Sequence, residues 1–316
     1  MLSGRSALRM AGMNDPVVPV LKASDYMVAR RRAIISTDAK NQADDQYAIV
    51  HALLSPIVDV RAIVPAHFGT DRGSASMQQS RAEVELLLDL MELTGSVQVA
   101  NGAECALVDD LAPQDSEGAR LIVEEARQDT STLFVVAIGP LTDVASAILL
   151  DREVIEQRAI IVWVGGPPYG DRLAAHWPET NLANDVHAAR VVFGSAAELW
   201  QIPMSTYTQL SVSHEELRLW VRPHGPIGRY LVDQLLEFAR RAPIRLDSHS
   251  LCDTAGIGLV INPGAAVWRA QSPVQIAPDL SYEPADAGAH IRVAEHVDSR
   301  FMLNDLFAKL DAFGRR

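Results

Sequence analysis

The sequence predicts an α/β protein with a single domain, in which helices flank a mostly parallel central sheet. Three observations lead to this fold class. Short apolar runs recur along the chain, helical patterns separate them, and no linker-like segment interrupts the 316 residues. Alternation of strands and helices is typical of parallel sheets with right-handed crossovers, and this length suffices for one large domain.

The apolar runs of the first half are the predicted strands. They lack a period-two alternation of apolar and polar residues, which indicates strands that are covered on both faces. These strands span residues 33–35, 60–64, 133–138 and 159–164.

Helical patterns lie between and after these strands. Pro140 stands in the first turn of one of them, where a missing N–H costs little. Asp185 is interpreted as the N-cap of another. The predicted helices span residues 44–54, 74–93, 116–127, 141–150, 185–193, 214–221, 225–240, 254–261 and 298–313.

The predicted domain covers residues 33–316, and we expect residues 1–32 to be a poorly ordered leader. The leader is polar and aperiodic, and no apolar signal core follows its arginines, which argues against an export signal. No apolar run approaches the length of a membrane span. The two cysteines lack a CxxC spacing, which fits a reducing cytosol. We therefore expect a cytoplasmic protein.

The charge of the chain narrows the range of partners. The formal net charge is −12 and 48% of the residues are apolar. Nucleic-acid polymers and anionic membranes bind basic faces, so neither is an expected partner. Small ligands and cations remain as candidates.

Acidic residues follow the first predicted strand. Asp38 comes directly after it, and Asp44 and Asp45 begin the next helix. Two later strands run into the glycine-bearing turns "GPLTD" and "GGPPYG". Because parallel strands end at one edge of a sheet, these segments should meet in one crevice. Three carboxylates so close together suit a hard divalent cation. Alternatively, Asp44 and Asp45 are helix-start acids that the helix dipole stabilises.

Two further segments carry candidate site residues. If residues 178–185 are extended, Glu179 and Asn181 point to the same side and present a carboxylate and an amide to vicinal hydroxyls. A solvated loop is the alternative. Asp253 precedes a small, apolar helix and is either a cap or a site residue.

Taken in order, several segments resemble the nucleoside hydrolases that cleave inosine, uridine and similar ribosides. They are "STDAKNQADDQYAI", "VVAIGPLTDVASAI", "VGG", "ETNLANDVHAARVVF" and "CDTAGIGLVINP". The similarity extends from about residue 33 to the C-terminal "VDSRFMLNDL". The resemblance implies an α/β fold with bound calcium, hydrolysis of the N-glycosidic bond of a ribonucleoside to free base and ribose, a role in purine or pyrimidine salvage, and a homodimer or homotetramer.

Site residues are carried over from the resemblance position by position. Asp44 matches the base that activates a metal-bound water, and Glu179 and Asn181 match the ribose-binding acid and amide. The implied calcium ligands are Asp38, Asp45, Asp253 and the backbone carbonyl of Ile138.

The sequence departs from the family pattern near the expected substrate. The loop between Asp38 and Asp44 is longer than usual and adds Asn41 as a possible contact. The segment "PAHFGT", with His67, replaces a ribose-contacting asparagine. Cys252 stands where purine- and inosine-cleaving members have a histidine that protonates the leaving base. We expect Cys252 to line the pocket without acting as that acid, because a thiol is a weak donor. A small buried hydrophobe at the start of a helix is the alternative.

Aromatic and histidine side chains are further candidates for base recognition. Trp177 could stack on a nucleobase. The others are Tyr169, His176 and His249.

A catalytically silent riboside-binding protein on the same scaffold is the alternative function. A binder would not need the base at Asp44, which favours the hydrolase. An oxidoreductase that binds a dinucleotide is disfavoured because no GxGxxG turn follows the first strand.

Overall fold

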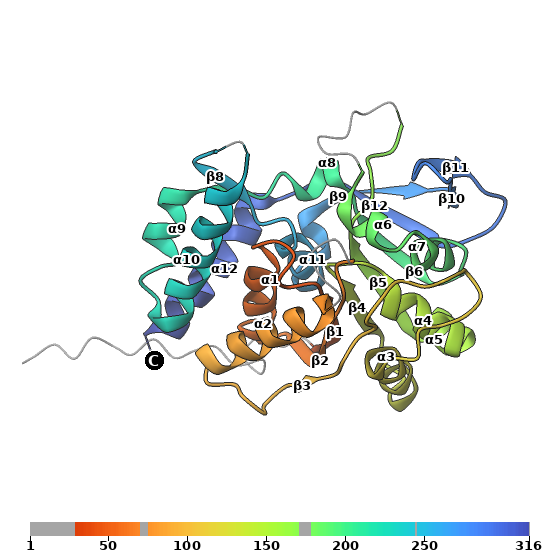
Figure 1. Cartoon of the computed structure of the whole chain (residues 1–316), viewed down its shortest axis with the longest axis horizontal. Helices are drawn as coiled ribbons and strands as arrows, with labels where there is room; N and C mark the ends of the chain where they lie inside the picture. Colours follow the sequence, from red (N-terminus) through yellow and green to blue (C-terminus); the bar gives the residue numbers. More distant parts are fainter. Residues whose placement is uncertain (1–28, 70–74, 171–177, 244, 316) are drawn as a thin grey trace, which may run out of the picture.

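The computed structural model describes residues 29–69, 75–170, 178–243 and 245–315. Helices cover both faces of a central sheet of eight strands (Figure 1). In their order across the sheet, the strands are β3 (Gln98–Val99), β2 (Val58–Pro65), β1 (Arg31–Thr37), β4 (Leu133–Ala137), β5 (Ala159–Val164), β6 (Glu198–Ile202), β12 (His290–Val297) and β9 (Ala266–Gln271).

Every neighbouring pair in this sheet is parallel except β12 and β9. The expected α/β class, with a mostly parallel central sheet between helices, is therefore confirmed. Two small antiparallel pairs lie outside the sheet. They join β7 (Ser211–Ser213) to β8 (Ser248–Ser250) and β10 (Val274–Ile276) to β11 (Tyr282–Pro284).

The four predicted strands correspond to β1, β2, β4 and β5. Strands β6 and β12 were not predicted, because their sequences "ELWQI" and "HIRVAEHV" mix charged and apolar residues. The first strand begins at Arg31, inside the expected leader. The Arg32 side chain is buried there, and its Nη2 lies 2.8 Å from the Glu125 carboxylate.

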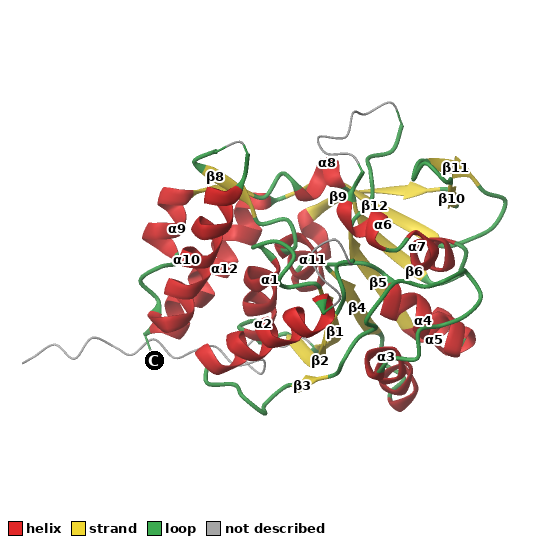
Figure 2. Cartoon of the chain, in the orientation of Figure 1, coloured by secondary structure: helices red, strands yellow, loops and turns green. Residues whose placement is uncertain are grey.

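Each predicted helix is present, with ends within three residues of the expected ones (Figure 2). The predicted helices are α1 (Asp45–Leu53), α2 (Ser76–Leu90), α3 (Glu117–Gln128), α4 (Thr142–Leu150), α7 (Val186–Phe193), α9 (His214–Trp220), α10 (Gly225–Arg241), α11 (Thr254–Ile261) and α12 (Ser299–Gly314). Three short α-helices within the described residues were not predicted. They are α5 (Arg152–Arg158), α6 (Thr180–Asn184) and α8 (Met204–Tyr207). Among the described residues, no helix is both long enough and apolar enough to cross a bilayer.

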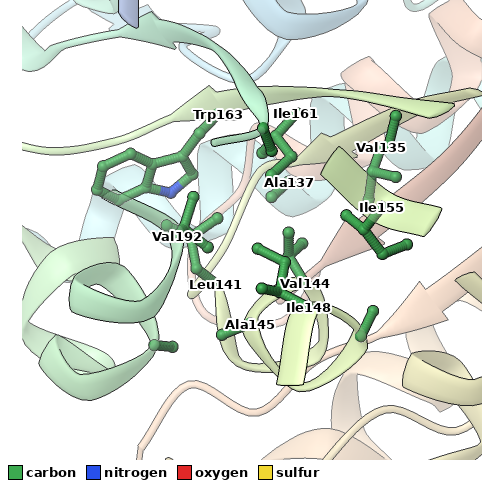
Figure 3. Packing of buried hydrophobic residues seen from close by; sticks show 14 of the residues in the cluster. Val135, Ala137, Leu141, Val144, Ala145, Ile148, Ile155, Ile161, Trp163 and Val192 are labelled. Carbon is green, nitrogen blue, oxygen red and sulfur yellow. The ribbon is translucent and has the colours of Figure 1, made fainter. Parts of the chain in front are cut away.

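The core consists of layers on the two faces of the sheet, because successive side chains of a strand point to opposite faces. Val135 and Ala137 of β4 pack toward α4, where Val144 and Ile148 meet them (Figure 3). The alternate residue Val136 packs on the other face with residues of α1, α11 and α12. A third apolar cluster joins α1, α2, α9, α10 and α12.

Helix α11 approaches the sheet closely because Gly256 has no side chain. A Cβ at this position would lie 3.1 Å from Val136 Cγ1 and 3.1 Å from Val164 Cγ2. This close contact fixes the height of α11 above the sheet, and therefore the place of Asp253, its N-cap residue.

The carboxyl ends of the central strands lie at one edge, as their register requires. Ser36 of β1 pairs with Ala137 of β4, and Val164 of β5 pairs with Ile202 of β6. The segments after β1, β5 and β6 carry many of the polar residues of the site described below, and Asp253 follows β8.

We predict that Gly256→Val destabilises the protein by about 1–3 kcal/mol, because overpacking a tight core contact forces backbone shifts. The midpoint of thermal unfolding should fall by several degrees. The matched control is Ala82→Val, at an exposed position of α2, which should lower the midpoint only slightly. Equal effects of the two substitutions would contradict this account of α11.

Candidate active site

A cavity of about 380 Å³ opens at the carboxyl edge of the sheet. The carboxylates that line it are Asp38, Asp44, Asp45, Glu179 and Asp253. Its other lining residues are Gln42, Ile138, Val164, Thr180, Asn181, Met204, Tyr207, Thr208, Ser211, Leu246, Ser248, His249, Ser250 and Cys252. This described lining contains no lysine or arginine.

Asp38 and Asp45 are held by hydrogen bonds from the end of β1 and from the loop that follows it. The Asn41 amide donates to Asp38 Oδ2 at 2.9 Å, and Thr37 Oγ1 donates to Asp45 Oδ1 at 2.6 Å. Both carboxylates are almost fully buried. Asn41 therefore positions Asp38, and it is not among the residues that line the cavity.

Asp44 and Asp253 are the N-cap residues of α1 and α11, but neither side chain caps its helix. Both carboxylates therefore remain available to the cavity. The backbone N–H of Asp253 donates to Asp44 Oδ2 at 3.4 Å and brings the starts of the two helices together.

Burial raises the pKa of all four of these aspartates. It raises the pKa of Asp38 to about 7, although the hydrogen bond from Asn41 acts in the opposite direction. The pKa values of Asp45 and Asp253 lie well above normal because of burial and of repulsion from neighbouring carboxylates. Burial also raises the pKa of Asp44, an effect that His249 partly offsets.

Asp44, Asp45 and Asp253 form a group of potential metal ligands. One oxygen from each lies within 4.8 Å of the others. No ion pair between any of the four aspartates and a described cationic side chain is present. A divalent cation would supply the missing positive charge, and carboxylate and carbonyl oxygens are the ligands that hard cations prefer.

Glu179 and Asn181 differ in conformation from the expectation. The segment is not extended, because Glu179 is the N-cap of α6 and Asn181 lies in its first turn. Glu179 Oε2 accepts hydrogen bonds from the backbone N–H groups of Gly166 and Leu182, at 2.8 and 2.9 Å. The first N–H groups of a helix lack backbone partners, and the Glu179 carboxylate supplies an acceptor for them. This favours a helix start over an extended segment.

Both side chains nevertheless line the cavity. Glu179 Oε1 accepts bonds from the Asn181 N–H and the Tyr207 hydroxyl, at 3.3 and 3.2 Å, so the Glu179 carboxylate is firmly held. The Asn181 amide donates to the Val164 carbonyl at 2.9 Å. This bond leaves the amide oxygen of Asn181 as an acceptor.

Tyr207 and Gln42 are cavity residues that the sequence pattern did not indicate. Tyr207 ends the short helix α8, and only the pairing of β5 with β6 brings α8 beside Glu179. Gln42 lies in the unusually long loop after Asp38, and the length of this loop was the available signal.

His67 lies outside the cavity lining. Its ring is buried, its Nδ1 accepts from the Gly69 N–H, and its Nε2 lies 2.8 Å from Thr142 Oγ1. The Thr142 hydroxyl in turn donates to Asp185, which caps α7 as expected. This chain of bonds ties the loop after β2 to the starts of α4 and α7.

Cys252 lines the cavity beside Asp253 and is half-buried. Its thiol donates to the Ser250 carbonyl at 3.5 Å. Burial, followed by the charges of Asp44 and Asp253, holds the pKa of Cys252 well above normal. A protonated thiol suits pocket lining better than nucleophilic attack. Trp177 and His176 lie outside the described residues.

Comparison with known proteins decides the family. Residues 33–304 match the family described as inosine-uridine preferring nucleoside hydrolase. The chain belongs to this family. It is therefore a nucleoside hydrolase, an enzyme that acts on the N-glycosidic bond of ribonucleosides, as the resemblance implied. Members of the family depend on a metal ion, and the acidic group of Asp44, Asp45 and Asp253 offers this nucleoside hydrolase a site for one.

Curated relatives have low identity to this chain. It is 26% identical over 228 residues to the probable uridine nucleosidase 2 of Arabidopsis thaliana, covering 64% of this chain and 68% of the relative. It is 27% identical over 218 residues to the pyrimidine-specific ribonucleoside hydrolase RihA of Escherichia coli O7:K1, covering 62% and 67%.

Solved structures share the fold over nearly the whole chain. A purine-preferring ribonucleoside hydrolase from Gardnerella vaginalis superposes with a TM-score of 0.76 at 20% identity, covering 90% of this chain and 99% of that one. A plant nucleoside hydrolase, PpNRh1, superposes with a TM-score of 0.71 at 20% identity, covering 89% and 98%. The fold of this nucleoside hydrolase is thus shared at low sequence identity.

We predict that the metal-free protein loses stability as pH rises from about 4 to about 7. A raised pKa means that the folded protein binds the proton more tightly than the unfolded chain, so stability falls as pH rises from the normal value toward the raised one. For Asp38 this window runs from 3.8 to about 7. Thermal unfolding in the presence of chelator measures the effect. Asp45→Asn removes one titrating group and should give a shallower decline, whereas equal slopes would contradict the electrostatic account.

Proposed function

We propose that this nucleoside hydrolase releases free base and ribose from a ribonucleoside with the help of a bound calcium ion. The supporting observation is the group of four buried aspartates without a cationic partner on one cavity. Buried charges are costly unless they are paired or bind metals. Calcium accepts six to eight oxygen ligands, including backbone carbonyls and water, which fits this set of donors.

The family resemblance supports one division of roles. In it, Asp44 is the base. The calcium ligands are Asp38, Asp45, Asp253 and the Ile138 carbonyl. The short distances among Asp44, Asp45 and Asp253 support a second arrangement, in which Asp44 is a ligand and Asp38 accepts the proton. We retain the first assignment, and the variants below distinguish the two.

The chain's own residues provide the chemistry around the sugar. When bound, the ion supplies a positive charge that makes water more acidic and holds the ribose hydroxyls. Asp44 accepts the proton from the water that attacks C1′. The ribosyl group becomes oxocarbenium-like as the base departs, and the neighbouring carboxylates stabilise its positive charge. The Asn181 amide oxygen accepts from a ribose hydroxyl beside the firmly held Glu179.

The remaining expectations are part of the proposal. The family resemblance supports a homodimer or homotetramer. The two free cysteines, Cys105 and Cys252, support a cytoplasmic location. The names of the curated relatives make uridine and cytidine the first substrates to test.

We expect exhaustive chelation to abolish nucleoside hydrolysis and to lower the thermal midpoint, because an ion that binds only the folded state stabilises it. Calcium should restore both, and magnesium should restore less, since magnesium requires a stricter octahedral geometry. Release of free base and of ribose measures turnover. Full activity of the metal-free protein would rule out the metal site.

We expect Asp44→Asn to lower turnover by about 10²–10⁴-fold, the range typical of a lost acid–base group. The calcium-induced rise in thermal midpoint should persist in this variant and should be lost in Asp38→Asn. If the calcium-induced rise is instead lost in Asp44→Asn and kept in Asp38→Asn, Asp44 is the metal ligand and Asp38 is the base. The control is Asp286→Asn, at an exposed residue outside the cavity, which should change neither quantity.

A further inference from the structure

The cavity has two groups of lining residues with different chemistry. One group carries the carboxylates and Asn181, which the proposed function assigns to the metal and the ribose. The other comes from the β7–β8 pair and the segments that adjoin it, which lie beside α9 (Figure 2). If the ribose occupies the first group, the leaving base must contact the second.

Most hydroxyls of the second group are already engaged within the protein. Ser211 Oγ and Ser250 Oγ lie 2.9 Å apart, and each donates to the Thr208 carbonyl, at 3.2 and 3.1 Å. The Thr208 hydroxyl donates to the Met204 carbonyl at 2.7 Å. These groups therefore stabilise the wall of the cavity more than they serve a ligand.

His249 is different, because its ring is fixed while its nitrogens are free. It lies in the middle of β8, paired with Val212, and is half-buried. Phe238 of α10 packs against the ring at 5.8 Å between centroids and 84° between planes. The imidazole makes no hydrogen bond to another described residue, and its proximity acts to lower the pKa of Asp44.

We propose that His249 donates a hydrogen bond to the leaving base and thereby favours substrates whose base presents a ring nitrogen or carbonyl acceptor. An imidazole carries at least one N–H in either protonation state, so this role does not depend on its charge. The inference rests on the proposed function and adds a residue that determines substrate specificity.

The hydrogen bond acts on the bond that breaks. The water oxygen bonds to C1′ and Asp44 takes one water proton, while the electron pair of the C1′–N bond passes to the base nitrogen, which solvent then protonates. Negative charge grows on the base during this step. A hydrogen-bond donor beside the base therefore stabilises the transition state more than it stabilises the bound substrate. A 4-nitrophenyl riboside, whose leaving phenolate is stable unaided, needs this donor far less.

The test compares three substitutions of His249 on the two kinds of leaving group. His249→Ala removes the ring, His249→Phe keeps a ring without N–H, and His249→Gln keeps an N–H donor. On the best nucleoside, we expect kcat/KM of the Ala and Phe variants to fall by about 10- to 100-fold, as for loss of a charge-assisted hydrogen bond. On 4-nitrophenyl riboside their loss should be several-fold at most. The Gln variant should recover part of the nucleoside activity.

The control is His290→Ala, at an exposed position of β12, which should leave both activities unchanged. Equal losses on both substrates would show a structural role and overturn the proposal, as would unchanged nucleoside activity of the Phe variant. If the Ala variant does not fold, the comparison of Gln with Phe decides. If the wild-type protein cleaves neither substrate in the presence of calcium, this result contradicts the proposed function. The role of His249 is contradicted only by the outcomes named above for its variants.

Discussion

Repulsion among four buried aspartates is the constraint around which this site is organised. Asp38, Asp44, Asp45 and Asp253 are each less than a tenth exposed, and none of them forms an ion pair with a described cationic side chain. Such a group opposes folding unless protons or a cation neutralise it. Stability and function are therefore linked at this edge of the sheet.

The surrounding structure limits this repulsion with hydrogen bonds that come from several elements. Asn41, in the loop after β1, donates to Asp38. Thr37, the last residue of β1, donates to Asp45. The Asp253 N–H reaches Asp44 across 209 residues of sequence. That contact requires α11 to return to the start of α1, and the absence of a side chain at Gly256 permits the close approach.

The site combines a buried acidic part with a second wall, to which we assign the base. The first strands of the sheet, together with α1 and α11, position the carboxylates. The region from α8 to β8 lines the other part, and its engaged hydroxyls leave His249 as a free donor held by Phe238. The shared fold extends over about nine-tenths of this chain in structures that are only 20% identical.

Local sequence patterns determined the central strands, the major helices and the acidic segment after β1. These features depend on short-range preferences, since covered strands are apolar throughout and each helix carries its own periodicity. The end of β1 also placed Asp38, because a parallel sheet collects the ends of its strands at one edge. Strands β6 and β12 were missed because both contain charged residues, which hide the apolar pattern typical of a covered strand. Their burial comes from neighbours that are distant in sequence.

Only the tertiary structure decided how the lining side chains are used. It turned Glu179 from an expected extended residue into the N-cap of α6, engaged by Gly166, Leu182 and Tyr207. It placed His67 in a buried hydrogen-bonded chain outside the cavity, and His249 within the cavity. The sequence specifies the type of each of these residues, but strand pairing and helix packing determine which groups each of them contacts. A local pattern therefore reveals which groups can do chemistry, and the long-range contacts select those that face the ligand.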